Sequence, residues 1–348
     1  MKAALDATYS LDRHLSGVGV YSREILFGLA RSHSESGFVF CYRPHRFLRS
    51  FSERLPGNCA RRLLWKDWPS SPDLFHGLNQ RIDSTRYRRT ISTFHDLFVL
   101  TGEYSTPEFR RRFAEQARLA AERSDIVIAV SEFTARQVRD LLKVEQARIR
   151  VVHHGVRGPE RVAPAAVREK MILFVGAIQR RKNVARLVEA FERVGEGWKL
   201  VLAGSLGFGA AEIQVRIESS PRRSDIQLPG YVTAECLEDL YARASIFAFP
   251  SLDEGFGMPV LEAMARGVPV LTSNSSALAE ISGDAALLVD PGDAGSIEGG
   301  LRSLIQNEAL RADLVGRGLA HSARFTWEKA VEQTWAVYRE SGLTPRVS

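Results

Sequence analysis

Short apolar runs bounded by turn residues alternate with longer amphipathic runs along the whole chain. The short runs are rich in β-branched and aromatic residues, which predicts strands. In the longer runs apolar residues recur every three to four positions, which predicts helices with one buried face. Strands and helices that alternate in this way predict parallel sheets with helices on both faces, an α/β fold.

The pattern repeats in the two halves of the sequence. Strands are predicted at 1–7, 38–42, 73–77, 89–94, 125–130, 148–154, 171–176, 198–204, 246–251 and 267–273. Helices are predicted at 19–31, 106–124, 131–143, 183–194, 233–244 and 258–267. Residues 155–170 lack periodicity and carry two prolines, which indicates a linker. We therefore expect two doubly wound, Rossmann-like domains that face each other across a cleft, with ligands at the carboxyl ends of the strands.

Composition agrees with a soluble globular protein, since 45% of the 348 residues are hydrophobic and 25% are charged. The chain opens on a predicted strand instead of a signal peptide, and no apolar run approaches the length of a membrane span. The three cysteines are widely spaced, which argues against a disulfide framework or a zinc site. Together these features predict a cytoplasmic protein.

Positive charge is concentrated in the first half. Residues 1–165 hold 27 lysines and arginines against 18 acids, a balance of +9, whereas the remainder holds 20 against 23, a balance of −3. Arginine clusters lie at 61–62, 86–89 and 110–112. This excess admits nucleic acid, an anionic membrane or an acidic substrate as partner, although each cluster alone is typical of a solvated face.

The segment DEGFGMPVLEAMARGVPVL, residues 253–271, places a glycine loop directly before a predicted helix. Pro259 suits a first helical turn and Gly267 suits a helix stop. Gly255 and Gly257 therefore precede a helix N-terminus, where free amides and the helix dipole favour an anion such as a diphosphate.

Glu254 and Glu262 flank this predicted anion site. Phosphate would repel both carboxylates, so they are better suited to accepting hydrogen bonds from sugar hydroxyls. Residue spacing alone leaves two simpler alternatives open, because Glu262 could complement the helix dipole and Glu254 could be an ordinary loop acid.

The stretch EGFGMPVLE resembles the E-x7-E motif of glycosyltransferase family 4, whose members are retaining enzymes with the two-domain GT-B fold. The resemblance covers nearly the whole chain, in order, through SGVGVYSREIL, FHDL, VSEFTARQV, VVHHGV, FVGAIQRRKNVARLVEAF, LPGYVTAECLEDLYARASIFAFPS and NSSALAEISGDAALLVDP. It implies a nucleotide-sugar donor and no cofactor. The implied domains are 1–165, on the acceptor side, and 166–325, on the donor side, with a terminal helix at 326–348 that packs back on the first.

The same resemblance implies a role for each motif residue. Glu254 would contact the donor sugar beside the reacting carbon, and Glu262 would hold the nucleotide ribose. Lys182 would bind the diphosphate. The other residues implied to line the donor site are Gly17, Gly19, Gly176, Tyr231, Val232, Gly255, Phe256, Gly257, Met258 and Pro259.

The chain departs from one common family pattern. Many relatives carry an arginine directly after the strand glycine, whereas here Gly176 is followed by Ala177. Arg181 is therefore the expected second cation of the catalytic set, and Arg180 is the poorer candidate.

His95 follows a predicted strand and precedes Asp96, as in the family's HD pair. Its implied role is to contact the donor sugar and shape the reacting site, with Asp96 in support. The adjacent His153 and His154 point in different directions and have no acidic partner at ligand spacing, so we predict no metal site.

The motifs RRKN and FHDL most resemble bacterial mannosyltransferases of polysaccharide assembly. The expected donor is GDP-mannose, with a UDP-sugar as the alternative. The expected acceptor is a lipid-linked saccharide on the arginine-rich first domain, which would bring the protein transiently to the inner face of an anionic membrane.

Two alternatives come from other functional classes. The first is an epimerase or a phosphorylase of the same fold. A phosphorylase would need a lysine site for pyridoxal phosphate, and no such site can be located in the sequence. The second is a non-catalytic module that binds nucleotide-sugars or nucleic acid. The intact Glu254, Glu262, Lys182 and His95 argue against a degenerate module, and basic patches without interleaved aromatic residues argue against nucleic acid.

Overall fold

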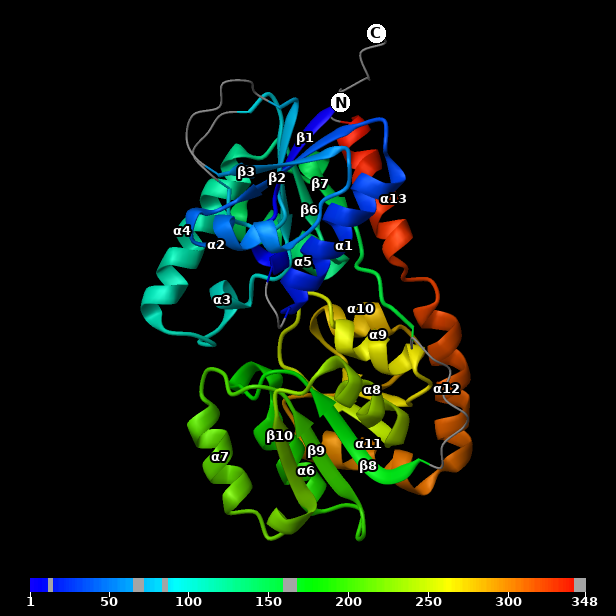
Figure 1. Ribbon diagram of the computed structural model, residues 1–348. Helices are drawn as coiled ribbons and strands as arrows, with labels where there is room; N and C mark the ends of the chain where they lie inside the picture. The colour runs from blue at the N-terminus through cyan, green and yellow to red at the C-terminus, as the bar shows by residue number, and fades with distance from the viewer. Residues whose placement is uncertain (12–14, 65–71, 83–86, 159–167, 341–348) are drawn as a thin grey trace. The chain divides into compact units, whose positions relative to one another are not determined.

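The computed structural model describes residues 1–11, 15–64, 72–82, 87–158 and 168–340. The chain forms two compact units (Figure 1). Unit 1 contains Met1–Thr101, Thr106–Gly155 and the segment that starts at Thr326, and unit 2 contains Gly102–Ser105 and Val156–Phe325. The chain leaves unit 1 after Gly155, whereas the expected boundary at 165/166 lies outside the described residues.

Unit 1 is built on a parallel sheet ordered β3-β2-β1-β4-β5-β6-β7. Its strands are β1 (Lys2–Asp6), β2 (Gly37–Tyr42), β3 (Cys59–Leu63), β4 (Leu74–Gly77), β5 (Thr90–Phe94), β6 (Ile126–Ala129) and β7 (Ile149–Val151). Its α-helices are α1 (Gly17–Ser32), α2 (Pro44–Phe47), α3 (Phe98–Thr101), α4 (Pro107–Arg123), α5 (Glu132–Leu142) and α13 (Trp327–Glu340). Its 3-10 turns are η1 (Thr8–Leu11), η2 (Leu48–Ser52) and η3 (Gln146–Arg148).

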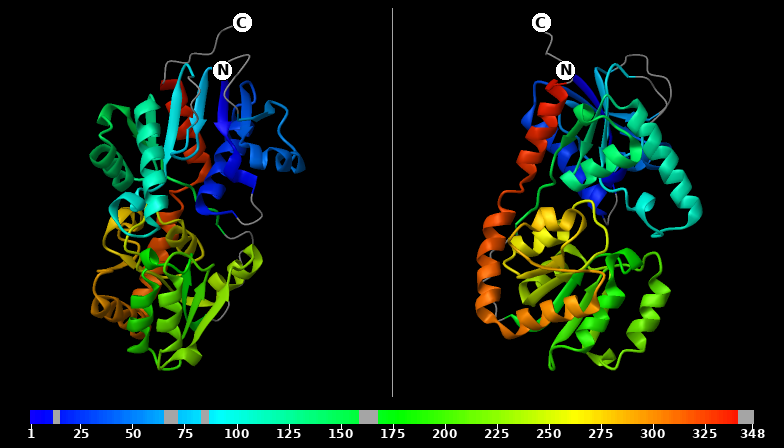
Figure 2. Two further views of the ribbon diagram at one scale, coloured as in Figure 1. Left: turned by 90° about the vertical axis from the view of Figure 1, so that its left-hand side faces the viewer. Right: turned by 180° about the vertical axis from the view of Figure 1, so that it is seen from behind.

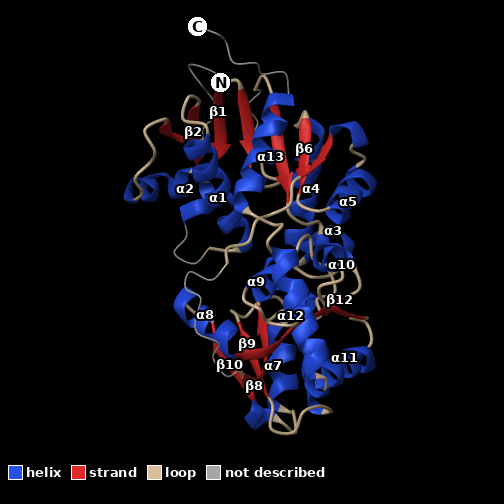
Figure 3. Cartoon of the chain, turned by 90° about the vertical axis from the view of Figure 1, so that its right-hand side faces the viewer, coloured by secondary structure: helices blue, strands red, loops and turns tan. Residues whose placement is uncertain are grey.

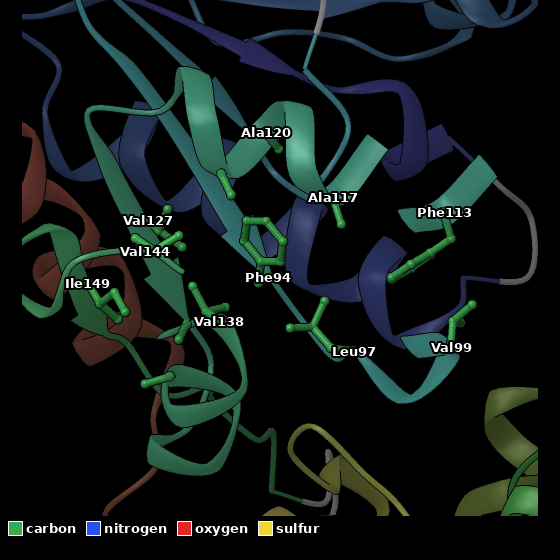
Figure 4. Close-up of a cluster of buried hydrophobic side chains, with 13 residues drawn as sticks. Phe94, Leu97, Val99, Phe113, Ala117, Ala120, Val127, Val138, Val144 and Ile149 are labelled. Carbon is green, nitrogen blue, oxygen red and sulfur yellow. The ribbon is translucent and has the colours of Figure 1, made fainter. Parts of the chain in front are cut away.

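Alternating side chains along β5 explain why helices cover both faces of this sheet (Figure 2). Phe94 is buried in an apolar cluster with Ala117 of α4 and Val138 of α5 (Figure 4). The preceding Thr93 points to the opposite face, where its hydroxyl lies 3.0 Å from that of Tyr21 on α1. Helix α13 packs along α1 on that face.

The contact between α1 and α13 is close because α1 carries a glycine there. A Cβ atom on Gly28 would lie 2.3 Å from Cγ2 of Val331 on α13. The terminal helix is therefore part of unit 1, although 170 residues of unit 2 separate it from the rest of that unit.

Unit 2 is built on a second parallel sheet, ordered β10-β9-β8-β11-β12-β13. Its strands are β8 (Glu169–Val175), β9 (Lys199–Ala203), β10 (Ile226–Gly230), β11 (Ala244–Phe249), β12 (Val270–Ser273) and β13 (Leu287–Val289). Its α-helices are α6 (Val184–Glu192), α7 (Ala210–Glu218), α8 (Ala234–Arg243), α9 (Met258–Ala265), α10 (Ser276–Ser282), α11 (Ala294–Gln306) and α12 (Glu308–Ser322). Its 3-10 turns are η4 (Arg180–Lys182) and η5 (Arg223–Asp225).

Both units confirm the predicted doubly wound α/β fold, and every predicted strand and helix is present. The last part of the predicted terminal helix, 341–348, lies outside the described residues. The sequence patterns missed β3, β10, β13, the short helices α2 and α3, and α7 and α10–α12. Within the described part of the chain, no helix is long and apolar enough to cross a membrane.

Candidate active site

The loop after β11 enters α9 through a turn that requires glycine. Gly257 caps α9 with φ +105°, and a Cβ atom there would lie 2.5 Å from Cδ2 of Leu278. Pro259 sits in the first turn, and Gly267, with φ +63°, follows the end of the helix. The helix start and stop predicted from the sequence are therefore confirmed. The backbone amides of the first turn lie at the edge of the sheet that is formed by the carboxyl ends of its strands.

Glu254, on this loop, forms ion pairs with two of the three cations of η4. The Lys182 Nζ lies 2.5 Å from its Oε1, and the Arg181 Nη1 lies 2.8 Å from its Oε2. All three side chains are largely buried. Burial alone would raise the pKa of Glu254, but the charges of Arg181 and Lys182 outweigh it and hold the pKa at about 2. We call Arg181, Lys182 and Glu254 the charged triad; its net charge is +1.

Backbone and ring contacts hold the triad in place. Arg181 also donates to the carbonyl of Asp253, and the backbone amide of Leu252 donates to the Arg181 carbonyl at 2.8 Å. The Lys182 Nζ lies 4.6 Å from the centre of the Phe249 ring, at the end of β11. Because burial and these contacts restrict the side chains, the charges are preorganised.

Asn183 joins the turn of the triad to two other loops. It adopts a left-handed conformation, with φ +59°, and its Nδ2 donates to the carbonyls of Pro250 at 2.9 Å and Pro291 at 2.7 Å. The left-handed turn ends η4 and starts α6, which aims Lys182 at the loop after β11. The sequence analysis missed this residue, although asparagine is one of the non-glycine residues that most often adopt a left-handed conformation.

Glu262 has different partners from Glu254. The Tyr241 hydroxyl of α8 donates to its Oε2 at 3.1 Å, and burial raises the pKa of Glu262. Arg266 lies 5.1 Å from the Tyr241 ring and pairs with Glu238. The two glutamates of the motif are thus held separately, one by cations at the loop and one by a phenol on a neighbouring helix. Tyr241 was not singled out by the sequence analysis.

The other expected donor residues of unit 2 lie on three loops. Gly176 follows β8 with φ +150°, and its carbonyl approaches so closely that a Cβ atom on Gly204 would lie 1.9 Å from it. Tyr231 is 52% exposed at the end of β10, followed by the half-buried Val232. Phe256 is buried edge-on against Phe325, with ring centres 6.1 Å apart. The remaining positions, next to the cap of α9, are the buried Gly255 and the half-buried Met258.

His95, in unit 1, is held as a neutral imidazole. Its Nε2 donates to the carbonyl of Leu78 at 2.9 Å, so its Nδ1 carries no proton and can accept from the His154 Nε2, 3.4 Å away. Burial lowers the pKa of His95 to about 4 and that of His154 well below its ordinary value. Asp96 follows at the start of the α3 turn and is half-buried. The pairing of the two histidines was not predicted.

A chain of buried hydroxyls and an imidazole lies beside this pair. The His76 Nδ1 is 2.6 Å from the Tyr338 hydroxyl, and its Nε2 is 2.9 Å from that of Thr93. Thr93 in turn bonds Tyr21, whose ring meets that of His95 edge-on at 4.7 Å. We call these four residues, from Tyr338 to Tyr21, the buried polar chain. It links α13 to the ring of His95, and no sequence motif marks it.

The two glycines expected near the donor begin α1. Gly17 is its first residue and is exposed, while the amide of Gly19 donates to the Ser16 side chain at 3.3 Å. A Cβ atom on Gly19 would lie 3.0 Å from the carbonyl of Tyr9, so the backbone passes η1 closely. His95, Gly17 and Gly19 belong to unit 1, and every other expected site residue belongs to unit 2. Among the described residues, no three His, Cys, Asp or Glu side chains form a metal-binding group.

Two Rossmann-like units with parallel sheets define the GT-B class, and solved structures of that class match the chain. Sucrose-phosphate synthase from Thermosynechococcus elongatus superposes with a TM-score of 0.75 at 21% identity, covering 98% of both chains. The glycosyltransferase WaaG of lipopolysaccharide biosynthesis gives 0.74 at 15%, covering 97% of this chain and 99% of its own. Anabaena HepE, solved with UDP and glucose, gives 0.74 at 15%, covering 98% and 100%.

The chain belongs to the glycosyl transferases group 1 family, whose model matches residues 160–339, while the Glycosyltransferase Family 4 model matches residues 15–157. O-antigen chain mannosyltransferase B of Escherichia coli is 30% identical over 295 residues, 80% of this chain and 77% of that protein. The serotype-specific mannosyltransferase WbdA of Escherichia coli is 29% identical over 69% of this chain, which spans only 32% of WbdA. The family resemblance inferred from the motifs is thus confirmed.

Proposed function

We propose that this glycosyltransferase moves mannose from GDP-mannose to a hydroxyl of a lipid-linked glycan and retains the anomeric configuration. The observation that carries the proposal is the charged triad beside the N-terminus of α9, a preorganised site for a diphosphate leaving group. Similarity to O-antigen chain mannosyltransferase B supports mannose as the sugar. A UDP-sugar is the alternative donor, as in the HepE complexes.

In the proposed reaction, breaking the bond between sugar and phosphate leaves negative charge on the departing diphosphate. Lys182, Arg181 and the first amides of α9 stabilise that charge as it develops, without a metal ion. Glu254 fixes the two cations before the donor arrives and accepts a hydrogen bond from a sugar hydroxyl. Glu262 holds the ribose hydroxyls, with its Oε2 oriented by Tyr241.

The triad also argues against Glu254 as a base or a nucleophile. A carboxylate whose two oxygens are ion-paired, with a pKa of about 2, binds protons weakly at neutral pH. We infer that the leaving phosphate takes the proton of the acceptor hydroxyl. His95 remains neutral and contacts the donor sugar without transferring a proton, because its Nε2 proton is hydrogen-bonded to the carbonyl of Leu78.

The donor is tested by thermal denaturation of the whole chain with GDP-, UDP- and ADP-sugars in excess chelator. We expect GDP-mannose to give the largest stabilisation, because a ligand that binds only the folded state raises its stability. The anomeric configuration of the product, read by NMR, tests retention. Stabilisation by RNA alone, or turnover of the donor to an epimer without transfer, would contradict the proposal.

A further inference from the structure

A short helical segment of unit 1 exposes two large apolar side chains on one face. Helix α2 runs directly into η2, so residues 44–52 form one continuous turn structure. Leu48 is 82% exposed and Phe51 is 62% exposed. Residues three apart eclipse in a 3-10 helix, so the two side chains project together. Exposed apolar side chains that lie together, instead of scattered singly, are typical of interaction surfaces.

The surrounding contacts hold this face open. The rings of Phe47 and Phe51 meet edge-on with centres 5.5 Å apart. The Arg61 Nε donates to the carbonyl of Ser50 at 3.0 Å, and its guanidinium lies 5.1 Å from the Phe51 ring. Ser50, between the two apolar residues, is fully buried, so Ser50 and Arg61 anchor the segment to the rest of unit 1 while Leu48 and Phe51 stay exposed. Figure 3 shows the segment beside α1, to which Glu53 is tied through Arg23.

The apolar face lies within the most one-sidedly charged part of the described chain. Residues 43–62 contain six arginines and a single acid, Glu53, a balance of +5. Arg49 and Arg54 are exposed beside the apolar pair. Apolar tips surrounded by guanidinium groups match the boundary between anionic headgroups and acyl chains, where the rings enter the lipid and the arginines meet phosphates.

We propose that this surface, the α2 face (Arg46, Phe47, Leu48, Arg49, Phe51 and Arg54), docks the protein on an anionic phospholipid bilayer. Charge complementarity selects the bilayer over a second copy of the chain, whose α2 face would repel its own kind. The inference rests on the proposed function for its purpose, delivery of a lipid-linked acceptor. The segment follows the carboxyl end of β2, the sheet edge that also carries His95.

The test is cosedimentation of the full chain with vesicles of phosphatidylglycerol and phosphatidylethanolamine, and with vesicles of phosphatidylcholine alone. We expect binding to the anionic vesicles only, weakened by added salt. Leu48→Ser combined with Phe51→Ser should lower the partition coefficient about tenfold or more, because both apolar groups leave the interface. The matched controls are Val215→Ser, an exposed apolar residue of α7, and Phe109→Ser, beside the arginines of α4. Both should bind as the parent protein does.

Three results would overturn the proposal: equal binding of the Leu48/Phe51 double variant and the parent, loss of binding in Phe109→Ser instead, or a change of oligomeric state in the double variant with no change in vesicle binding. Stabilisation by GDP, measured on the same proteins, separates this inference from the proposed activity. If GDP has no effect while vesicle binding still depends on Leu48 and Phe51, the docking surface stands and the donor assignment fails.

Discussion

The two units offer a ligand opposite electrostatic environments. Unit 2 concentrates charge, with Glu254 held between Arg181 and Lys182. Unit 1 holds His95 and His154 neutral by burying them and pairing their nitrogens. From this difference we propose separate tasks: unit 2 would stabilise developing charge, and unit 1 would contribute shape and hydrogen bonds without moving a proton.

Removing a cation from unit 2 should have the largest effect. We expect Lys182→Ala to lower kcat about 10²- to 10³-fold, because a preorganised charge at the leaving group acts mainly in the transition state. Donor affinity should fall less than kcat, as initial-rate kinetics will show. Arg180→Ala is the matched control, because Arg180 is the neighbouring cation but pairs with Glu212 at the surface. An unchanged kcat in Lys182→Ala would contradict the assigned role.

Neutralising Glu254, the anion of the triad, should strengthen the binding of GDP, whereas removing Lys182 should weaken donor binding. Glu254→Gln raises the net charge of the triad from +1 to +2 and keeps a hydrogen-bonding side chain of the same length. We therefore expect GDP to bind about tenfold more tightly while kcat falls, a tenfold change being about 1.4 kcal/mol. Calorimetric titration of GDP measures the affinity. Weaker GDP binding would show that Glu254 does not act as the counter-charge.

Acid should destabilise the two units in different pH ranges. Burial lowers the pKa of His76 to about 3 and that of His95 to about 4, so below pH 6.5 the unfolded state binds more protons than the folded state. Unit 1 should therefore lose about 1.4 kcal/mol per pH unit for each histidine as pH falls from 6.5 toward 4. The stability that Glu254 adds is present above pH 4.5 and is lost only as pH falls toward 2.

Hydrogen exchange resolved by residue and corrected for intrinsic rates can separate these ranges. Between pH 6.5 and 4.5, amides of β5 should lose protection while those of β11 keep it. Replacing the exposed His45 by glutamine should leave this pattern unchanged. Loss of protection in β11 before β5 as the pH falls would contradict the contrast between the neutral histidines of unit 1 and the charged triad of unit 2.

The last prediction concerns the buried polar chain, where we expect an effect on stability and none on the charges of unit 2. Tyr338→Phe removes the hydroxyl 2.6 Å from His76 and should cost about 1–3 kcal/mol in the free energy of unfolding, since a buried nitrogen loses its partner. It should also shift the imidazole ¹⁵N resonances of His76. Thr334→Val is the control, because its hydroxyl bonds only the carbonyl of Ala330 on the same helix. Unchanged ¹⁵N shifts in Tyr338→Phe would exclude the link between α13 and His76.

The sequence predicted the interior of both sheets but missed most of their edges. β3, β10 and β13 are edge strands, and their residues are partly exposed, so no continuous apolar run marks them. Arg61 and Arg62 occupy β3, and Pro229 occupies β10, where an edge position tolerates a missing donor. Interior strands, buried on both faces, produced the strongest pattern.

The candidate site also has a part that the sequence could predict and a part that it could not. The glycine turn, Pro259 and the two glutamates lie within one short segment, so local chemistry could predict an anion site there. The buried polar chain joins residues as far apart as Tyr21 and Tyr338, and only tertiary packing brings them together. The pairing of Glu254 with Lys182 spans 72 residues, so the sequence could predict the charges but not their mutual neutralisation.

A crystal structure with GDP bound tests the central claim most directly. We predict that the diphosphate oxygens lie within hydrogen-bonding distance of the Lys182 Nζ and of the first amides of α9, with Arg181 still paired to Glu254. A diphosphate bound elsewhere, with Lys182 and Glu254 paired as they are without ligand, would contradict the account.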